Sequence, residues 1–355
     1  MKRRIATIYA IAQTALLLAG LALVFFFAWK GEIADVVWCL IGMAASFVIA
    51  PVLHELGHVF FALSAQMECV LVKCFCFKIV RVQGKKRFRF ASPFAADETQ
   101  VIPKTGGNMQ KRAAKYAIGG LLVSGVFVAL LVLAAICCTC FWRTQFVLWG
   151  VIPYAAYLFL LNVAPLEYAS GKTDVLVYIG IKKNAPVEKN MLAAMEIQGN
   201  LYAGKSFAEL DENLYYALPQ LVEDEPMYAV MLDLRYRYHL EKGELERAGD
   251  CLNRLAQSQE YLPYEQVMQV AVELTYMHAV NGDIENAEES AKLCKESLQE
   301  DTARAKRALL AYALATGNHE GVAVLREQAF AVADKEYPSG VAKSEKILLA
   351  RLCEE

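Results

Sequence analysis

The stretch His54-Glu55-Leu56-Gly57-His58 lies inside an apolar run that extends from Val36 to Ala65. On a helix, His54 and His58 are four residues apart, so both imidazole rings leave the same face and can share one metal ion. Glu55 lies one step around that helix, where its carboxylate can take a proton from a metal-bound water. Because two histidines and a glutamate are costly to bury in an apolar segment, we expect a functional site on a membrane helix.

Zinc is the metal that this pattern of ligands favours. Two histidines on one helical turn are typical zinc ligands, and a bound Zn²⁺ lowers the pKa of its water toward about 7. A hydroxide nucleophile is then available at neutral pH. The alternative interpretation is a pair of hydrogen-bonded core histidines beside an incidental glutamate.

Composition divides the chain into two parts. The 355 residues are 56% hydrophobic and 21% charged, which is too apolar for one soluble domain and too charged for a membrane bundle throughout. Residues 1–182 hold the long apolar runs, whereas residues 185–355 are rich in Glu, Lys, Arg, Ala and Leu. We therefore predict an α-helical polytopic membrane domain followed by an all-α soluble domain. The net charge of −2 gives no sign of nucleic acid binding, and the ten cysteines show no disulfide framework.

Four segments of the first part are predicted to cross the membrane. A signal peptide is the alternative for the first segment, but its roughly 25 apolar residues exceed the usual apolar core of such a peptide. The predicted spans are Ile5–Trp29, Val36–Ala65, Tyr116–Trp142, and Phe146 to about Ile181.

Basic residues predict how these spans are oriented. Residues 67–115 carry eleven Lys or Arg and three acids, whereas the loops near Lys30 and Arg143 hold one base each. Since basic loops remain in the cytoplasm, the N-terminus and everything after Lys182 are expected there. The sequence thus predicts a multi-pass protein of the cell membrane with a cytoplasmic C-terminal domain.

A short β-hairpin is predicted in the basic loop. Val70–Val82 is rich in β-branched and aromatic residues, Gln83-Gly84-Lys85 has the composition of a turn, and Lys86–Phe90 alternates basic with aromatic residues. One interpretation is a cytosolic surface that touches anionic lipid. The other is a strand edge that receives an extended substrate.

A catalytic zinc site with two histidines needs a third protein ligand and an open position for water. The fourth predicted span holds the candidates, between Leu161 and Asp174. Asn162 and Pro165 indicate a helix that breaks inside the membrane, which is tolerated where the backbone lines a polar cavity. Asp174 follows this break and Glu167 lies within it, so either carboxylate could complete the site.

In these motifs the chain resembles the site-2 protease family of intramembrane zinc metalloproteases. That family pairs His-Glu-x-x-His on one membrane helix with Asn-x-x-Pro and a following Asp-Gly on a later one, and the resemblance covers roughly residues 36–180. It implies His54, His58 and Asp174 as zinc ligands, Glu55 as general base, and Asn162 as a residue that helps to hold unwound substrate.

The sequence departs from the family at one position near this site. Val175 stands where the family usually has glycine after the aspartate. Glu167 therefore stays open as a substitute for Asp174.

The C-terminal part shows weak internal repetition. Gly204, Gly243, Gly282 and Gly317 recur at intervals of 39, 39 and 35 residues. A small residue follows the last three glycines at the fifth position, as in Gly243 and Ala248. This spacing resembles tetratricopeptide-type helical hairpins, which stack into a solenoid with a binding surface. A plain helical bundle that stabilises the membrane domain is the alternative.

Together these features predict an intramembrane zinc metalloprotease that cleaves membrane-embedded peptides or signalling proteins near the cytosolic side. Its expected partners are a transmembrane substrate, membrane lipid and a cytosolic protein bound by the helical repeats. The alternative is a non-proteolytic membrane adaptor that keeps zinc only for structure. The presence of Glu55 argues against this alternative, because structural zinc needs no base.

Overall fold

A computed structural model describes residues 2–82, 84–93, 97–104, 107–137, 142–168 and 171–354. The chain divides into two compact units. The first, here called the membrane unit, comprises Met1–Arg81 and Lys86–Glu188, and the second, the helical unit, comprises Val82–Lys85 and Lys189–Glu355. Each unit is described by itself.

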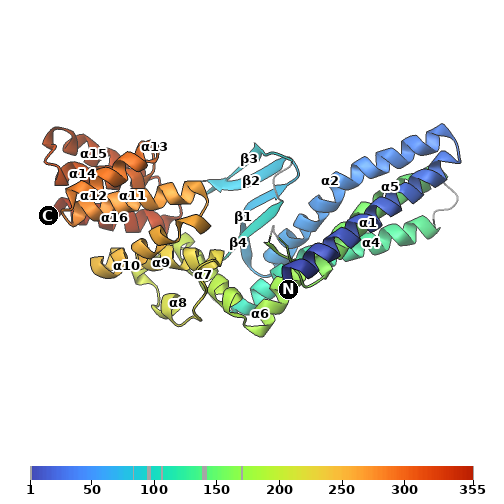
Figure 1. Ribbon diagram of the computed structural model, residues 1–355, viewed down its shortest axis with the longest axis horizontal. Helices are drawn as coiled ribbons and strands as arrows, with labels where there is room; N and C mark the ends of the chain where they lie inside the picture. Colours follow the sequence, from blue (N-terminus) through green and yellow to red (C-terminus); the bar gives the residue numbers. More distant parts are fainter. Residues whose placement is uncertain are drawn as a thin grey trace. The chain divides into compact units, whose positions relative to one another are not determined.

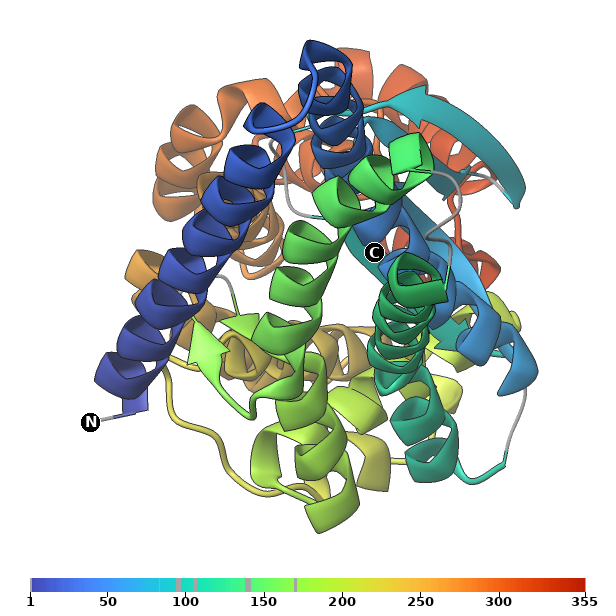
Figure 2. The same ribbon diagram turned by 90° about the vertical axis from the view of Figure 1, so that its right-hand side faces the viewer.

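The membrane unit is built around four long helices that lie beside one another (Figures 1 and 2). Helix α2 contacts α1, α4 and α5, and α4 also packs against α5. Three short segments complete the helical part of the unit: α3 before α4, and the hairpin β5–β6 and helix α6 after α5. The helices are α1 (Lys2–Trp29), α2 (Ile33–Ser64), α3 (Met109–Ala117), α4 (Gly119–Cys137), α5 (Trp142–Val163) and α6 (Asp174–Lys183), and the hairpin strands are β5 (Glu167–Tyr168) and β6 (Gly171–Lys172).

Four stretches of these helices are long and apolar enough to cross a membrane, which indicates a membrane protein. Large apolar side chains such as Ile8, Leu16 and Leu130 are exposed on them. A helix suits this environment because all its backbone hydrogen bonds are made within the segment. The stretches are Arg4–Trp29, Ile33–Ser64, Met109–Cys137 and Gln145–Val163.

The last two spans differ from those predicted. The third apolar stretch begins at Met109 and is divided at Ile118, where α3 ends and α4 begins. Helix α5, in the fourth predicted span, ends at Val163, and the apolar residues after Asp174 form the separate helix α6. Pro165 cannot continue a helix because it lacks an N–H group, which explains this end. Residues 138–141 of the third predicted span, which include Cys138 and Cys140, and residues 169–170 of the fourth lie outside the described residues.

Glycines allow α2 and α5 to approach closely. A β-carbon at Gly42 would overlap the backbone of Val147, and a β-carbon at Gly150 would overlap the backbone of Cys39. Small residues at such contacts let helix backbones meet where no hydrophobic effect drives association. The contact holds α2 against the helix that leads into the predicted break.

A four-stranded antiparallel sheet, in the order β3-β2-β1-β4, follows α2 directly. The prediction of a single hairpin was therefore incomplete. The predicted strand run Val70–Val82 reverses direction at Phe75 and so forms both β1 and β2. A further strand, β4, was not predicted; it pairs with β1 and places Thr99 opposite Val72. Neither Phe75 nor Cys76 is a residue type that is common in turns, which explains why the sequence did not predict this reversal. The strands are β1 (Met67–Cys74), β2 (Phe77–Val82), β3 (Lys85–Phe90) and β4 (Glu98–Pro103); Gln83 lies outside the described residues.

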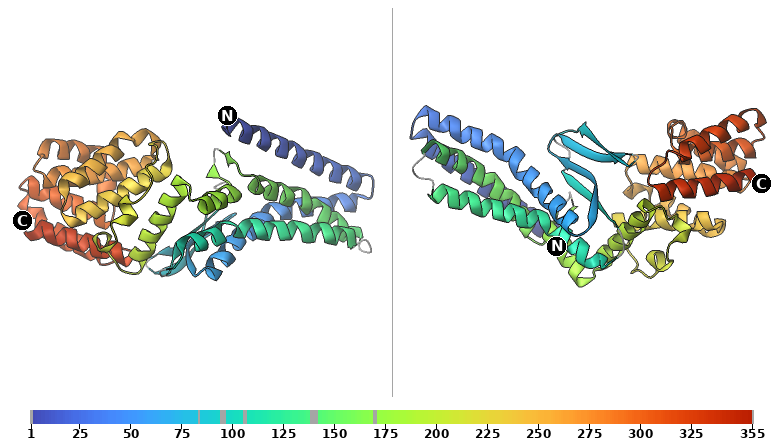
Figure 3. Two further views of the ribbon diagram at one scale, coloured as in Figure 1. Left: turned by 90° about the horizontal axis from the view of Figure 1, so that it is seen from below. Right: turned by 180° about the vertical axis from the view of Figure 1, so that it is seen from behind.

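The helical unit consists mainly of antiparallel helices that lie side by side (Figure 3, orange to red). Three consecutive pairs, α9 with α10, α11 with α12 and α14 with α15, pack as hairpins. The helices are α7 (Pro186–Tyr202), α8 (Asn213–Tyr216), α9 (Pro226–Lys242), α10 (Leu245–Gln257), α11 (Tyr264–Val280), α12 (Ile284–Leu293), α13 (Lys295–Leu298), α14 (Ala303–Ala315), α15 (His319–Ala333) and α16 (Ser339–Glu354).

The three hairpins turn at glycines in the left-handed conformation. Gly243, Gly282 and Gly317 have φ angles of 78°, 74° and 70°. At each, the amide of the following residue donates to a carbonyl five residues earlier, as Glu244 N does to His239 O at 2.9 Å. This is the hydrogen-bond pattern of a helix C-cap that favours glycine. Whether the hairpins form a tetratricopeptide-like repeat stays a prediction.

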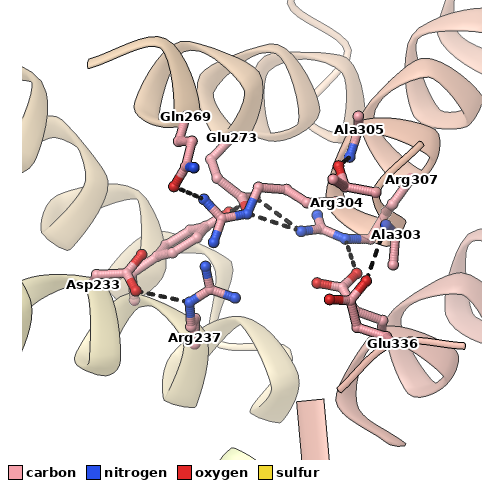
Figure 4. A network of polar contacts seen from close by, with 12 residues as sticks. Asp233, Arg237, Gln269, Glu273, Ala303, Arg304, Ala305, Arg307 and Glu336 are labelled. Carbon is pink, nitrogen blue, oxygen red and sulfur yellow. Dashed lines mark hydrogen bonds and ion pairs between the residues drawn. The ribbon is translucent and has the colours of Figure 1, made fainter. Parts of the chain in front are cut away.

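A buried charge network joins four helices of this unit (Figure 4). Arg307 on α14 bonds Glu273 on α11 at 2.9 Å and Glu345 on α16 at 2.8 Å, and the Arg307 side chain is only 1% exposed. Tyr236 on α9 donates to the same Glu273 at 2.7 Å. Burial opposes the charge of Arg307, yet the two carboxylates hold its pKa well above the usual value. The network is therefore an internal ion-pair cluster.

Candidate metal centre

Helix α2 presents the two histidines toward α3 and α4. Nδ1 of His58 lies 3.0 Å from the backbone oxygen of Tyr116, and Nδ1 of His54 lies 3.0 Å from Oγ of Ser124. A carbonyl oxygen can only accept, so Nδ1 of His58 carries the proton and its Nε2 keeps a free lone pair. Partners of this kind on Nδ1 orient metal-binding histidines.

Asp174 approaches both free nitrogens. It is the first residue of α6, and Thr173 caps this helix by accepting from Leu176 N. Its Oδ2 lies 3.1 Å from Nε2 of His54 and 3.4 Å from Nε2 of His58, and the two Nε2 atoms are 3.3 Å apart. This oxygen is buried without a hydrogen-bond partner. With Nδ1 of His54 donating to Ser124 Oγ, as Nδ1 of His58 does to Tyr116 O, three acceptor atoms face one another across a small triangle.

The triangle has the dimensions of a zinc site. Bonds of about 2.0–2.1 Å in a tetrahedron place neighbouring ligand atoms about 3.3–3.4 Å apart. The three distances above agree with this value to within 0.3 Å. Acceptor atoms that repel one another in an empty triangle would be neutralised by a cation, so these residues fit the metal that the sequence predicts.

The two carboxylates left open by the sequence occupy different places. Asp174 joins the histidines, whereas Glu167 lies on the short strand β5, is exposed, and does not belong to the His54–His58–Asp174 group. The Val175 departure is compatible with this geometry, because Val175 lies within α6, where a helical backbone needs no glycine.

Glu55 is held from the sheet. Oγ1 of Thr99 on β4 donates to Oε2 of Glu55 at 2.6 Å, and both side chains are buried. The hydroxyl of Tyr116 donates in turn to the backbone oxygen of Thr99. Only one oxygen of the Glu55 carboxylate is engaged by this contact, so the other remains available to a neighbouring molecule.

One cavity of about 480 Å³ in the membrane unit is lined by His54, Glu55, His58, Thr99, Tyr116 and Asp174. The side-chain exposure of 13% for His54 and 20% for Asp174 leaves the triangle open to this cavity. Asn162 also lines it, near the end of α5, and its amide donates to Leu158 O at 3.2 Å. The predicted residues therefore come together in a space large enough for a peptide segment.

Close glycine contacts leave room beside the imidazoles. A β-carbon at Gly120 would lie 2.9 Å from Cε1 of His54 and still nearer to Nε2 of His58. Gly57 would meet the backbone oxygen of Gly119 at 2.7 Å if it carried a β-carbon. Two glycines of α4, Gly119 and Gly120, thus pack against the motif itself.

No sequence motif marks Thr99, Tyr116 or Ser124 as part of the site. Ser124 lies in an apolar segment rich in small residues, where a serine is typical of ordinary helix packing. Thr99 and Tyr116 carry no local signal, since their relation to Glu55 and His58 exists only in the folded chain. Two other histidines lie beside carboxylates in the helical unit, His239 beside Glu244 and His278 beside Asp283.

Comparison of the chain with models of protein families, with curated proteins and with solved structures finds no match in any of the three.

Proposed function

We propose that this protein is an intramembrane zinc metalloprotease of the site-2 protease type. The observation that carries the proposal is the meeting of His54, His58 and Asp174 around one point, with Glu55 beside them. These residues come from α2 and α6, which are more than a hundred residues apart in the chain. Such a convergence of metal ligands and a base in one cavity is the arrangement that metal-assisted hydrolysis requires.

In this proposal each residue has one task. His54, His58 and Asp174 hold the metal, which when bound polarises a carbonyl and makes water a better nucleophile. Glu55 accepts a proton through its free carboxylate oxygen and returns it to the leaving nitrogen. Asn162, at the end of α5, offers an amide that can hold an unwound stretch of substrate.

The substrate would be a membrane-embedded peptide or protein, cut near the cytosolic face. The basic loop of residues 67–115 supports this orientation, because it carries eleven Lys or Arg and basic loops remain in the cytoplasm. A reporter enzyme fused to the helical unit should be active only in the cytosol. Activity on the outer face would contradict this topology.

The helical unit would bind a protein partner or present the substrate. The equivalent capped turns at Gly243, Gly282 and Gly317 support a tetratricopeptide-like array of hairpins. Ala248 and Ala287, the small residues five positions after two of these glycines, are fully buried where the paired helices meet.

Replacement of the base tests the proposal. Glu55→Gln keeps the shape of the side chain but removes its capacity to accept a proton, so cleavage of a model transmembrane substrate should fall to background. Zinc content should stay near that of the unchanged protein. Glu167→Gln, which changes an exposed carboxylate of the same unit, is the matched control and should cleave normally.

A non-proteolytic membrane adaptor is the second candidate function, supported by the helical hairpins. The two candidates differ in the Glu55→Gln experiment. If the unchanged protein binds zinc but no membrane peptide is cut, and binding of partners to the helical unit is unaffected by zinc removal, the adaptor is favoured.

A further inference from the structure

A second cavity, of about 280 Å³, lies within the helical unit. It is enclosed by α7, α9, α10 and the irregular segment that follows α8. Asn190, which is almost fully buried, donates to the backbone oxygen of Pro219 at 3.0 Å and so ties this segment to α7. Two arginines, Arg235 of α9 and Arg254 of α10, also line the cavity.

Neither arginine of this cavity has an acidic partner. Among the described residues, no carboxylate forms an ion pair with Arg235 or Arg254, and none lines the cavity. By contrast, Arg304 and Arg307 in the buried network each bind a glutamate. The cavity therefore holds two guanidinium groups that have no carboxylate partner among the described residues; Arg235 lies over the ring of Tyr216 and Arg254 over the ring of Tyr228.

Both guanidinium groups are held in place by neutral groups. Nε of Arg235 donates to Tyr215 O at 2.8 Å, and Nη2 of Arg254 donates to the hydroxyl of Tyr228 at 2.6 Å. These bonds use one donor of each guanidinium, which has five. Burial raises the pKa of the Cys251 thiol, and the charges of both arginines oppose that rise. Both guanidinium groups therefore lie near Cys251.

The remaining walls are largely apolar. They include Leu218, Leu221, Met231 and Tyr228. A ligand that satisfies both kinds of wall has an oxyanion at one end and an apolar body at the other. The volume is close to the lower limit for cavities that bind small molecules, about 300 Å³.

We propose that the helical unit binds a small organic oxyanion, a carboxylate or a phosphate monoester, between Arg235 and Arg254. Planar guanidinium groups bind such anions through paired, charge-assisted hydrogen bonds. The apolar body of the ligand lies against Leu218, Leu221 and Tyr228. This site is separate from the candidate metal centre and does not depend on the proposed proteolysis.

Calorimetric titration of the full-length protein in an uncharged detergent tests this inference. Phenyl phosphate and benzoate are the probes, and benzyl alcohol is the uncharged comparison. We expect at least one of the two anions to bind and benzyl alcohol not to. The tighter of the two anions identifies whether phosphate or carboxylate is the preferred group.

Arginine variants locate the binding. Arg235→Gln and Arg254→Gln should each weaken binding of the preferred anion about tenfold or more, because each removes charge-assisted hydrogen bonds. Arg247→Gln makes the same change on α10 at an exposed residue that lies outside the cavity, and should bind as the unchanged protein does. Arg254 is exposed, so its variant is expected to fold even if Arg235→Gln does not.

The inference is overturned if the unchanged protein binds neither anion, or if Arg254→Gln binds as tightly as Arg247→Gln. Equal binding of benzyl alcohol and the anions would also overturn it, because the arginines would then play no part.

Discussion

The two units bury charged groups in opposite ways. In the helical unit, Arg307 lies between Glu273 and Glu345, and positive and negative groups satisfy each other. In the membrane unit, Asp174 faces two histidine nitrogens that have no proton to donate once Nδ1 is protonated, and its oxygen is left without a partner. The first arrangement is complete by itself, whereas the second needs something from outside.

This difference separates stability from function. A buried ion pair is expensive to break, because removing one partner leaves a desolvated charge behind. A group of acceptors that face one another destabilises the folded chain until a cation arrives. Variants of each cluster therefore test whether the two behave in these two ways.

The largest effect is expected at Asp174. Asp174→Ala removes one of three ligands, so zinc affinity should fall by more than the roughly 10–100-fold that even outer contacts contribute, and cleavage should disappear with it. Equilibrium dialysis against zinc measures this. Glu167→Ala should keep its zinc; the reverse result would move the site to the hairpin before α6.

The same variant should not lower stability when metal is absent. Asp174→Ala removes a buried carboxylate oxygen that has no donor, so thermal unfolding of the chelated protein should occur at the same or a slightly higher temperature. A large loss of stability without metal would mean that the three residues form a self-sufficient cluster like that around Arg307.

Arg307→Met tests the helical unit. It leaves Glu345 buried without its arginine, and should lower the free energy of unfolding by about 3–5 kcal/mol. Thermal unfolding followed by circular dichroism gives the measurement. Lys343→Ala, which breaks the exposed pair with Glu209, is the control and should change stability by less than about 1 kcal/mol. A similar loss in both variants would contradict the comparison.

A smaller effect is expected at Thr99. Thr99→Val keeps the shape but removes the hydrogen bond to Glu55, so kcat should fall about 10–100-fold with little change in KM or zinc content. Thr99→Ser retains the hydroxyl and should recover most of the rate. If serine is no better than valine, Thr99 serves only the packing of β4.

The smallest change is expected at Gly120. A methyl group there would press on Nε2 of His58, and Gly120→Ala should weaken zinc binding by about tenfold, as loss of outer support does at metal sites. Gly125→Ala is the control on the same helix, because its β-carbon would meet only the ring of Phe159, which can move. Equal zinc affinity in the two variants would show that α4 has room to shift.

The sequence was informative where a pattern is local. The four apolar helices and the motif on α2 could be recognised because length, hydropathy and helical spacing are properties of a continuous segment. The end of α5 could be expected from Asn162 and Pro165. The preference for Asp174 over Glu167 came from the family resemblance alone, since the residues themselves do not show how the chain turns between two helices.

Contacts made across the chain escaped prediction. Thr99 supports Glu55 from a strand whose pairing with β1 has no local signature, and Tyr116 reaches two partners through its backbone and its hydroxyl. Arg307 stood among many charged residues of the helical half, and nothing nearby in sequence marks it as buried. Tertiary packing, rather than local preference, decides such positions.

The origin of the three ligands also has a consequence for the chain as a polymer. His54 and His58 belong to α2, whereas Asp174 opens α6, so a metal shared among them closes a loop that contains the sheet, α4 and α5. Closing a loop of this length removes many conformations from the unfolded chain and few from the folded one. Metal binding would therefore act as a removable cross-link, and a chelator would lower the free energy of unfolding of the whole membrane unit.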